Sequence, residues 1–361
     1  MSTVRCESVS LFTLTPGGQK LASQLRGHLP MKCYCAEKYL AHSTFSQGFE
    51  AFAGSFKNSV AQAFMRDSAI IVIGACGIVV RTIAPLLADK LSDPAVLVID
   101  EKGHNVISLL SGHLGGANEL TRYVSNILEA NAVITTSTDV NQTCSLDLLS
   151  RQMCAELVDF RRATKTVNQL LVSGEPVGIY VDPDLIELLG FDIHNFDIRG
   201  LRVVAADEPI ANDLSALIDV SMNGERPDWP VPSFQLIPKR IVAGVGCRKA
   251  LAPNVLLSLF EQHLARHHLH PLAVASLGSI DIKQDEPALL ELAKRCQVPL
   301  TLYSAEQLAQ SAERFPSSEF VKKTVGVGSV SQPVAWLLSG GQLLGETLKT
   351  QGVTISLGVL N

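Results

Sequence analysis

The sequence predicts an α/β protein in which two α/β domains with mostly parallel sheets are joined through a smaller middle module and a proline-rich linker. Short apolar segments of strand length alternate with amphipathic helical segments in both halves of the chain, which is typical of parallel sheets. Hydrophobic residues make up 47% of the chain and charged residues 18%, which indicates large buried sheets. The 361 residues also exceed the usual domain size of about 100 to 200 residues.

The first α/β domain is predicted over residues 1–140. Apolar, β-branched runs predict strands, and segments with helical periodicity predict helices. The expected elements are strand 9–14, a helix ending near 26, strands 31–35 and 70–73, helix 78–91, strands 95–99 and 105–109, helix 117–129 and strand 132–135. The turn at 100–103 joins two of these strands, so one hairpin is expected inside the sheet.

The middle module is predicted over 141–226, where the alternation weakens. Its expected elements are helices near 146–158 and 163–172 and a strand at 177–181. Four prolines then fall between 227 and 238, and they disfavour both helix and central strand, so this stretch predicts a linker. The second α/β domain is predicted over 239–361, with strand 241–245, helices 253–267 and 287–296, strand 299–302, helix 304–311 and strand 353–360.

Composition and charge exclude several classes of protein. The first residues do not resemble a secretory signal, and the longest apolar run, 69–80, is far shorter than the roughly 20 residues of a membrane span. We therefore expect a cytoplasmic protein without membrane contact. The net charge of −5 and the absence of basic runs argue against a nucleic-acid partner. The eight cysteines lack zinc-site spacing, which predicts reduced thiols and no metal site.

The first glycine loop, Gly74-Ala75-Cys76-Gly77, joins a buried strand to the start of a helix. Its NH groups and the positive end of the helix dipole suit a carboxylate or phosphate. Arg81, one turn later, is placed to clamp the same anion. A structural turn beside a surface arginine explains these residues equally well.

The second glycine loop, from Ser111 to Asn118, contains three glycines, a hydroxyl, an imidazole and an amide. Ligands of α/β sheets bind at the ends of strands, and this loop follows a predicted strand. His113, with an ordinary pKa of about 6.5, suits proton transfer at neutral pH. The alternative is a histidine that caps the following helix. Thr136 and Asp139 follow another short strand and are expected at the same edge as the glycine loops, although an ordinary turn also accounts for them.

Nucleotide cofactors are not indicated. The Gly244-Val245-Gly246 run resembles the start of a dinucleotide fingerprint, but Lys249 occupies the position of the third glycine. No lysine followed by serine or threonine ends a glycine loop, so a P-loop is not expected. Lys283, in the polar loop 281–286, is compatible either with a site or with the cap of the next helix.

Residues 74–120 (GACGIVVRTIAPLLADKLSDPAVLVIDEKGHNVISLLSGHLGGANEL) closely resemble the N-terminal domain of the cobalt-precorrin 5A hydrolase family, known as cobalamin biosynthesis protein G. The resemblance continues through 134–139. Segments that are similar to the family's C-terminal domain are 242–250 (VAGVGCRKA), 276–289 (SLGSIDIKQDEPAL), 299–308, 318–321 and 353–357. At 331–333 the chain has Ser-Gln-Pro where the family usually has a glutamate and alanines, so no acid is assigned there.

The resemblance implies a reaction on a contracted cobalt tetrapyrrole that carries a ring A δ-lactone. Water opens the lactone, and carbon–carbon cleavage releases acetaldehyde to give cobalt-precorrin 5B. Cobalt arrives with the substrate, so the protein needs no cofactor or metal site of its own. His113 and Ser111 are the expected catalytic residues, with His113 as the base and NH groups of 112–116 as donors to the developing oxyanion.

The anionic arms of the substrate are expected to be held by residues from both predicted domains. The expected substrate-binding residues are Gly74, Ala75, Gly77, Arg81, Gly112, Gly115, Gly116, Asn118, Thr136, Asp139, Arg248 and Lys283. Neighbouring pathway enzymes are candidate partners, and a homo-oligomer is compatible with the sequence. The main alternative is a non-catalytic protein that binds or channels the tetrapyrrole. A methyltransferase of the same pathway is less favoured, because both glycine loops match the hydrolase pattern.

Overall fold

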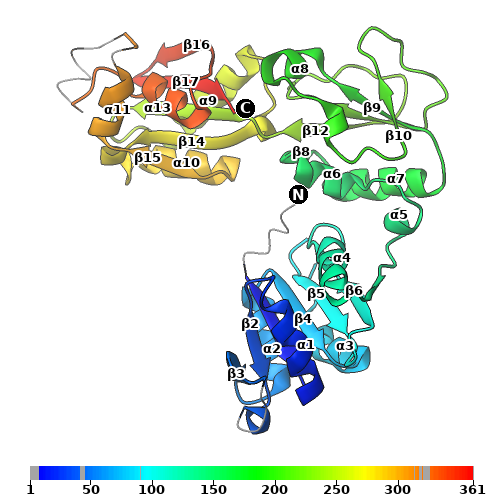
Figure 1. The fold of residues 1–361 in the computed structure, drawn as a ribbon. Helices are drawn as coiled ribbons and strands as arrows, with labels where there is room; N and C mark the ends of the chain where they lie inside the picture. The colour runs from blue at the N-terminus through cyan, green and yellow to red at the C-terminus, as the bar shows by residue number, and fades with distance from the viewer. Residues whose placement is uncertain are drawn as a thin grey trace. The chain divides into compact units, whose positions relative to one another are not determined.

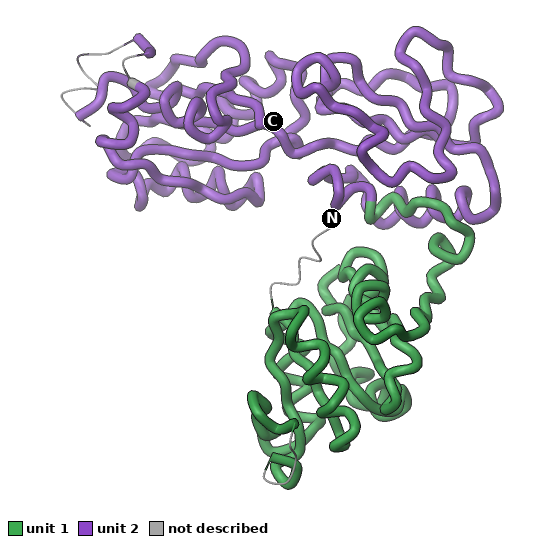
Figure 2. The backbone as a smooth tube through the Cα atoms, in the orientation of Figure 1, with its two compact units in different colours: residues 1–148 green, residues 149–361 purple. Residues whose placement is uncertain are grey.

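The computed structural model describes residues 8–40, 45–89, 91–312, 314–316, 319 and 326–360. The chain divides into two compact units, Met1–Leu148 and Leu149–Asn361 (Figure 2). The first unit contains a seven-stranded sheet, and the second contains two five-stranded sheets. Strands and helices alternate along much of the described chain (Figure 1), and the three sheets are mostly parallel, which confirms the α/β class. The cysteines 33, 35, 76, 144, 154, 247 and 296 are free thiols, and Cys6 lies outside the described residues.

The sheet of the first unit has the strand order β3-β2-β1-β4-β5-β6-β7. Its strands are β1 (Val9–Thr13), β2 (Lys32–Cys35), β3 (Phe49–Ala51), β4 (Ala69–Ile73), β5 (Ala95–Ile99), β6 (Asn105–Leu110) and β7 (Asn131–Val133). The strands from β3 to β5 run parallel, β6 is antiparallel to β5, and β7 is parallel to β6. The expected hairpin is therefore present. Alternate residues of β4 enter two different hydrophobic clusters, so both faces of the sheet are covered.

The helices of this unit are α1 (Pro16–Leu25), α2 (Phe56–Arg66), α3 (Cys76–Ile83), α4 (Ala117–Leu128), α5 (Ser137–Val140) and the start of α6 (Leu146–Gln152). Helix α1 begins where sequence rules place it: Thr15 caps the Gly18 NH at 3.2 Å, and Pro16 occupies the first turn. Helix α3 is shorter than the predicted 78–91. It gives way to a 3-10 turn at Ala84–Leu86, because Pro85 has no NH to continue the helix.

The direction of β6 decides which loops meet. Ile73, at the end of β4, pairs with Ile99, whereas Leu110, at the end of β6, pairs with Val96 near the start of β5. The first glycine loop therefore lies at the edge of the sheet where β4 and β5 end. The second glycine loop lies at the opposite edge, where β6 ends and β5 begins. A five-residue strand separates the two edges by roughly 16 Å. The expectation that both loops share one edge is wrong.

The first sheet of the second unit has the order β10-β9-β11-β12-β8. Its strands are β8 (Ala155–Leu157), β9 (Val177–Val181), β10 (Leu201–Val204), β11 (Ala216–Val220) and β12 (Ser233–Pro238), with helices α7 (Phe160–Val172) and α8 (Pro183–Leu189). Strand β12 lies between β11 and β8, so part of the predicted linker 227–238 is in fact a strand of this sheet. The prolines mark its ends: the Pro232 carbonyl accepts a bond from the Leu217 NH, and Pro238 is the last residue.

The last sheet has the order β15-β14-β13-β17-β16. Its elements are β13 (Ile241–Cys247), α9 (Pro253–Arg266), β14 (Val274–Ile280), α10 (Pro287–Cys296), β15 (Leu300–Tyr303), α11 (Ala305–Ala312), α13 (Ser331–Ser339), β16 (Leu343–Thr350) and β17 (Val353–Val359). Helix α13 packs so closely on β13 that a Cβ on Gly244 would lie 2.0 Å from the Ser331 carbonyl oxygen. Segment 318–321 lies almost wholly outside the described residues. No described helix combines the length and apolar character of a membrane span.

Candidate active site

The second glycine loop holds a conformation that depends on its glycines. Gly116 has φ +82°, the left-handed region that favours glycine. A Cβ on Gly112 would lie 2.8 Å from the Asn118 side-chain oxygen, and a Cβ on Gly115 would lie 2.4 Å from the Ser111 Cβ. The loop is thus folded tightly against the start of α4, and its glycines are needed for that close approach.

Ser111 serves the shape of the loop. It has φ +57°, which is uncommon for a residue with a side chain, and its hydroxyl donates to the Asp93 carbonyl at 2.9 Å. The main-chain carbonyl of Ser111 also accepts from the Ala117 NH. The hydroxyl is therefore engaged with the backbone, which does not support the catalytic role expected from the sequence.

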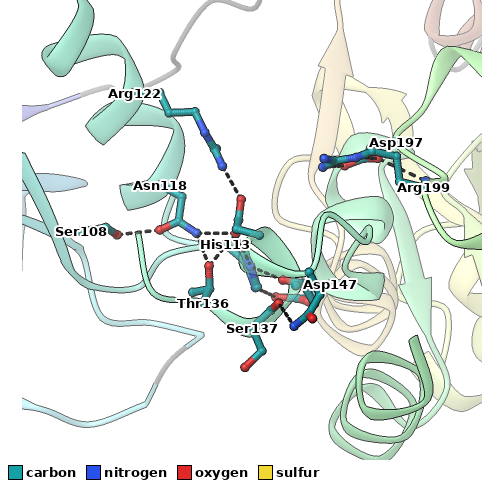
Figure 3. Close-up of polar contacts among 12 residues, drawn as sticks. Ser108, His113, Asn118, Arg122, Thr136, Ser137, Asp147, Asp197 and Arg199 are labelled. Carbon is teal, nitrogen blue, oxygen red and sulfur yellow. Dashed lines mark hydrogen bonds and ion pairs between the residues drawn. The ribbon is translucent and has the colours of Figure 1, made fainter. Parts of the chain in front are cut away.

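His113 lies between two carboxylates, those of Asp139 and Asp147, and Figure 3 labels the His113 ring and Asp147. Its Nε2 is 3.1 Å from the Asp139 Oδ2 and 2.9 Å from the Thr138 hydroxyl, and its Nδ1 is 3.5 Å from the Asp147 Oδ2. The exposed fraction is 19% for the side chain of His113 and 9% for that of Asp147. Both ring nitrogens thus face acidic partners in a largely buried setting. This surrounding suits the imidazolium form, in which both nitrogens donate.

The two carboxylates decide the charge of His113. Hydrogen bonds to Asp139 and then to Asp147 raise its pKa to about 9, against the opposing effect of burial. The ring is consequently protonated at neutral pH. The expectation of a neutral general base with an ordinary pKa is not supported, because a protonated imidazole has no lone pair with which to accept a proton.

Asp139 is the centre of the hydrogen-bond network. Besides His113, it accepts from the Asn118 amide at 2.8 Å, from the Thr136 hydroxyl at 2.6 Å and from the guanidinium of Arg122. The bond to His113, together with the other donors, holds the pKa of Asp139 well below its usual range despite partial burial. The structure thus brings together four residues that the sequence singled out, His113, Asn118, Thr136 and Asp139.

The NH groups of the loop are only partly available. The Gly116 NH donates to the His113 carbonyl, and the Asn118 NH donates to the Gly112 carbonyl. Among the described residues, the NH groups of Gly112 and Gly115 have no hydrogen-bond partner. These two are the donors that remain for a developing oxyanion, and Gly116 is not one of them.

The first glycine loop does not join this site. The Gly74 NH donates to the Ile99 carbonyl, which is the end of β5 opposite to the one that Ser111 approaches. The Arg81 guanidinium donates to the carbonyl of Gly77 in its own helix at 3.1 Å, and Ala75 is the residue that precedes the helix. Gly74, Ala75, Gly77 and Arg81 are therefore neighbours of one another and not of His113.

The two cations expected from the C-terminal half lie in the second unit. Lys283 forms an ion pair of 3.1 Å with Glu286, and the two side chains are only 13% and 5% exposed. Arg248 is exposed, and its side chain packs over Gly352. A buried, paired Lys283 is not an open anion clamp.

Sequence reasoning missed two members of the network, Arg122 and Asp147. Arg122 lies four residues after Asn118 on α4, so helical spacing was a usable signal. Asp147 lies in α6, which had been assigned to another module, so no local pattern linked it to His113. In the described part of the chain, no cluster of three or more His, Cys, Asp or Glu side chains has an arrangement that could hold a metal ion.

Comparisons with known proteins identify the family of this chain. Residues 58–139 match the family model described as cobalamin synthesis G N-terminal, and residues 241–358 match the one described as cobalamin synthesis G C-terminus. The first match ends at Asp139, so it covers the glycine loops and most of the network. It stops short of Asp147.

Curated relatives match over almost the full length. A cobalt-precorrin-5A hydrolase of Salmonella typhimurium is 51% identical over 99% of this chain and 99% of its own. A second, from Priestia megaterium, is 30% identical over 97% of this chain and 94% of its own. A probable cobalt-precorrin-5A hydrolase of Methanocaldococcus jannaschii is 25% identical over 82% of this chain and 86% of its own. Both family models and the full-length matches make this chain a member of the cobalamin synthesis G family, the family of the cobalt-precorrin-5A hydrolases.

Proposed function

We propose that this protein is a cobalt-precorrin-5A hydrolase of cobalamin biosynthesis, which opens the ring A δ-lactone and releases acetaldehyde to give cobalt-precorrin 5B. The observation that carries the proposal is the 51% identity to a curated hydrolase over 99% of both chains. The match spans 359 residues, and therefore both compact units. The alternative of a non-catalytic tetrapyrrole-binding protein is not favoured by any specific observation.

In this proposal His113 acts as a cation and proton donor. Its pKa of about 9 keeps the ring protonated when substrate arrives. Water adds to the lactone carbonyl and loses a proton to solvent, and the imidazolium stabilises the oxyanion that forms. Collapse of this intermediate breaks the ester C–O bond, and the freed alkoxide becomes the carbonyl of acetaldehyde as the adjacent carbon–carbon bond breaks. The macrocycle carbon left by this cleavage takes up a proton, which the imidazolium can donate. Asp139 and Asp147 hold the ring and its charge in place, so they are positioning residues.

The NH groups of Gly112 and Gly115 are proposed as the remaining donors to the same oxyanion. Each well-placed donor of this type contributes roughly 3 to 4 kcal/mol to the stability of the transition state. They flank His113 in the chain, so one small loop supplies both the backbone dipoles and the positive charge. Asn118 and Thr136 support the arrangement through their bonds to Asp139.

The cobalt of this reaction is part of the substrate, and we propose that the chain needs no resident metal or cofactor. The residues around His113 are hydrogen-bond donors and paired carboxylates, which bind, orient and protonate. A cytoplasmic location and contact with neighbouring pathway enzymes remain predictions from the sequence.

The test is acetaldehyde release from cobalt-precorrin 5A by the purified full chain, measured against a control without enzyme. His113→Gln keeps a polar side chain but cannot carry the charge, so we expect a loss of at least about a hundredfold in kcat. Thermal unfolding of the variant checks that it folds. Release at the uncatalysed rate with wild-type protein would favour the binding protein instead.

A further inference from the structure

Arg122 is far more exposed than the other charged side chains of the His113 network. It reaches the network from α4 (Figure 3), and its side chain is 52% exposed, against 19% for His113 and 16% for Asp139. Asp147 is buried more deeply, at 9%. The network contains two cations and two carboxylates, and it presents a cation at its surface. An anionic ligand that approaches this site therefore meets positive charge.

The position of Arg122 is fixed by the packing of its helix. Leu120 and Val124 of α4 are completely buried in the core of the first unit, and Asn118, one turn before Arg122, is also buried. Residues four apart lie on the same side of a helix, so Asn118 and Arg122 both reach Asp139. The guanidinium thus extends from a firmly packed helix to the central carboxylate of the network.

The two oxygens of Asp139 have different partners. Oδ2 accepts from three side chains, those of His113, Asn118 and Thr136. Oδ1 accepts from the Nη2 of Arg122. Two hydrogen bonds and the width of one carboxylate therefore separate this Nη2 from the imidazole Nε2, a distance of at most roughly 8 Å. Arg122 is within reach of a ligand that reacts beside His113.

The guanidinium of Arg122 keeps hydrogen-bond donors that the network does not use. It has five N–H groups, and its Nη2 donates to Asp139. Among the described residues, its Nε and Nη1 have no hydrogen-bond partner. Both ring nitrogens of His113, by contrast, already face carboxylates of the protein. Of the two cations, Arg122 is therefore the one that can receive a further carboxylate.

We propose that Arg122 binds a carboxylate arm of the tetrapyrrole substrate next to the lactone that reacts, an inference that rests on the proposed function. The N–H groups that Asp139 leaves open suffice for two parallel bonds to a carboxylate. Arms on neighbouring carbons of one ring lie close together, so the lactone can reach the His113 loop while the next arm reaches Arg122. The guanidinium then bridges two carboxylates and orients the lactone, and it takes no part in the bond changes.

The test is the affinity of the full chain for cobalt-precorrin 5A, measured by equilibrium dialysis in the His113→Gln background, where turnover is slow. Adding Arg122→Gln removes the guanidinium and keeps a polar side chain. The matched control is Arg66→Gln, because Arg66 lies on α2, is 48% exposed and is paired with the buried Asp67. We expect Arg122→Gln to weaken binding about tenfold and the control to bind within about twofold of its parent.

A titration of the His113 ring by NMR separates binding from positioning. Arg122→Gln removes a positive charge near the imidazolium, so we expect the pKa of His113 to stay where it is or to rise. A fall in this pKa together with unchanged affinity would mean that Arg122 only positions Asp139, and it would overturn the proposal. Equal weakening by Arg66→Gln would show a general charge effect and would overturn it as well.

Arg122→Lys tests the planar shape of the guanidinium and also serves if Arg122→Gln fails to fold. Lysine keeps the positive charge but cannot form two parallel bonds to a carboxylate, so we expect binding to weaken about threefold. Thermal unfolding of each variant checks the fold. Affinity equal to that of the parent in a folded Arg122→Lys variant would contradict the paired bonds to the arm.

Acetaldehyde release separates this proposal from the proposed function. In the single Arg122→Gln variant we expect KM to rise about tenfold with a smaller fall in kcat, because the arm does not take part in the bond changes. A wild-type protein that binds cobalt-precorrin 5A through Arg122 but releases no acetaldehyde would refute the hydrolase function alone. A hydrolase whose affinity and KM do not change in the variant would refute the role of Arg122 alone.

Discussion

The imidazole of His113 and the carboxylate of Asp147 face each other across 3.5 Å, although one lies in a glycine loop and the other in a helix well beyond it in the sequence. With Asp139 at the other ring nitrogen, this arrangement places a positive charge between two negative ones. The charge on His113 is therefore set by tertiary structure and not by the residues next to it.

The rate of acetaldehyde release should depend on pH through His113. A protonated donor with a pKa of about 9 remains active through neutral pH, and the rate falls as pH rises through about 9. A neutral histidine base would give the opposite limb, with loss of activity on acidification. Initial rates from pH 6 to 10.5, with folding checked at each end, decide between the two; an acidic limb near pH 6.5 would contradict the assignment.

Asp147→Asn should lower the pKa of His113 while leaving a hydrogen-bonding side chain in place. Removing one carboxylate weakens the preference for the imidazolium, so the fall in activity on the alkaline side moves to lower pH. An NMR titration of the His113 ring measures the same shift directly. A merely structural role for Asp147 would change stability and leave the midpoint where it was.

The folded first unit should lose stability as pH rises through the folded pKa of His113. Its pKa is raised in the folded protein, so the contribution is complete below about 6.5, the pKa in the unfolded chain, and is lost as pH rises through about 9. Urea unfolding of wild type and His113→Gln measures the difference. We expect the two curves to diverge most near pH 6 and to converge near pH 10.

Gly112→Ala should damage the site without changing a charged residue. The new Cβ would lie 2.8 Å from the Asn118 side chain, which must then move away from Asp139 and Ser108. We expect a loss of about 1 to 3 kcal/mol in unfolding free energy and a clear fall in kcat. Gly27→Ala is a control for glycine replacement in general, because its Cβ would meet no atom closer than 3.9 Å and its φ lies outside the left-handed region.

Ser111→Gly should leave kcat within a few fold of wild type. The change removes a bond to the Asp93 carbonyl, at a cost of about 1 kcal/mol, but glycine relieves the φ of +57° by a similar amount. Stability is expected to stay nearly constant. A drop of a hundredfold or more in a folded variant would restore the catalytic role that the sequence suggested for this hydroxyl.

His263 makes the second unit sensitive to acid. It is buried on α9 with neither ring nitrogen hydrogen-bonded, and burial lowers its pKa to about 4. Stability from this group is therefore present above about 6.5 and is lost as pH falls toward 4. His263→Phe keeps a ring beside His267 and should reduce the fall in melting temperature between pH 7 and pH 5; an unchanged fall would assign the effect to other groups.

Much of the first unit follows from its sequence, because local patterns define its strands, its hairpin and the position of both glycine loops. The turn at 100–103 already implied that β6 reverses direction, and following that reversal would have placed the two loops at opposite edges. Strand β3 and helix α2 were missed. Strand β12 was missed because prolines at the ends of a strand look the same in sequence as prolines within a linker.

The candidate site was predicted in part. Glycines, His113, Asn118, Thr136 and Asp139 were found because they crowd at predicted strand ends. Their protonation states could not be predicted. The pKa of His113 depends on Asp147, and no spacing of residues in the sequence indicates that Asp147 lies close to the glycine loop. The burial of the Lys283–Glu286 ion pair likewise depends on tertiary packing, which the local sequence does not show.

Helix α6 has a practical consequence for dissecting the protein. It contains Asp147, and the first compact unit ends one residue later, at Leu148. A fragment cut at residue 140, where the sequence placed the domain boundary, would keep His113 and Asp139 but lose one of the two acids that set the charge of the imidazole. Such a fragment could retain its sheet while the pKa of His113 returns toward its ordinary value. Inactivity of the fragment would therefore say nothing about which unit performs the chemistry.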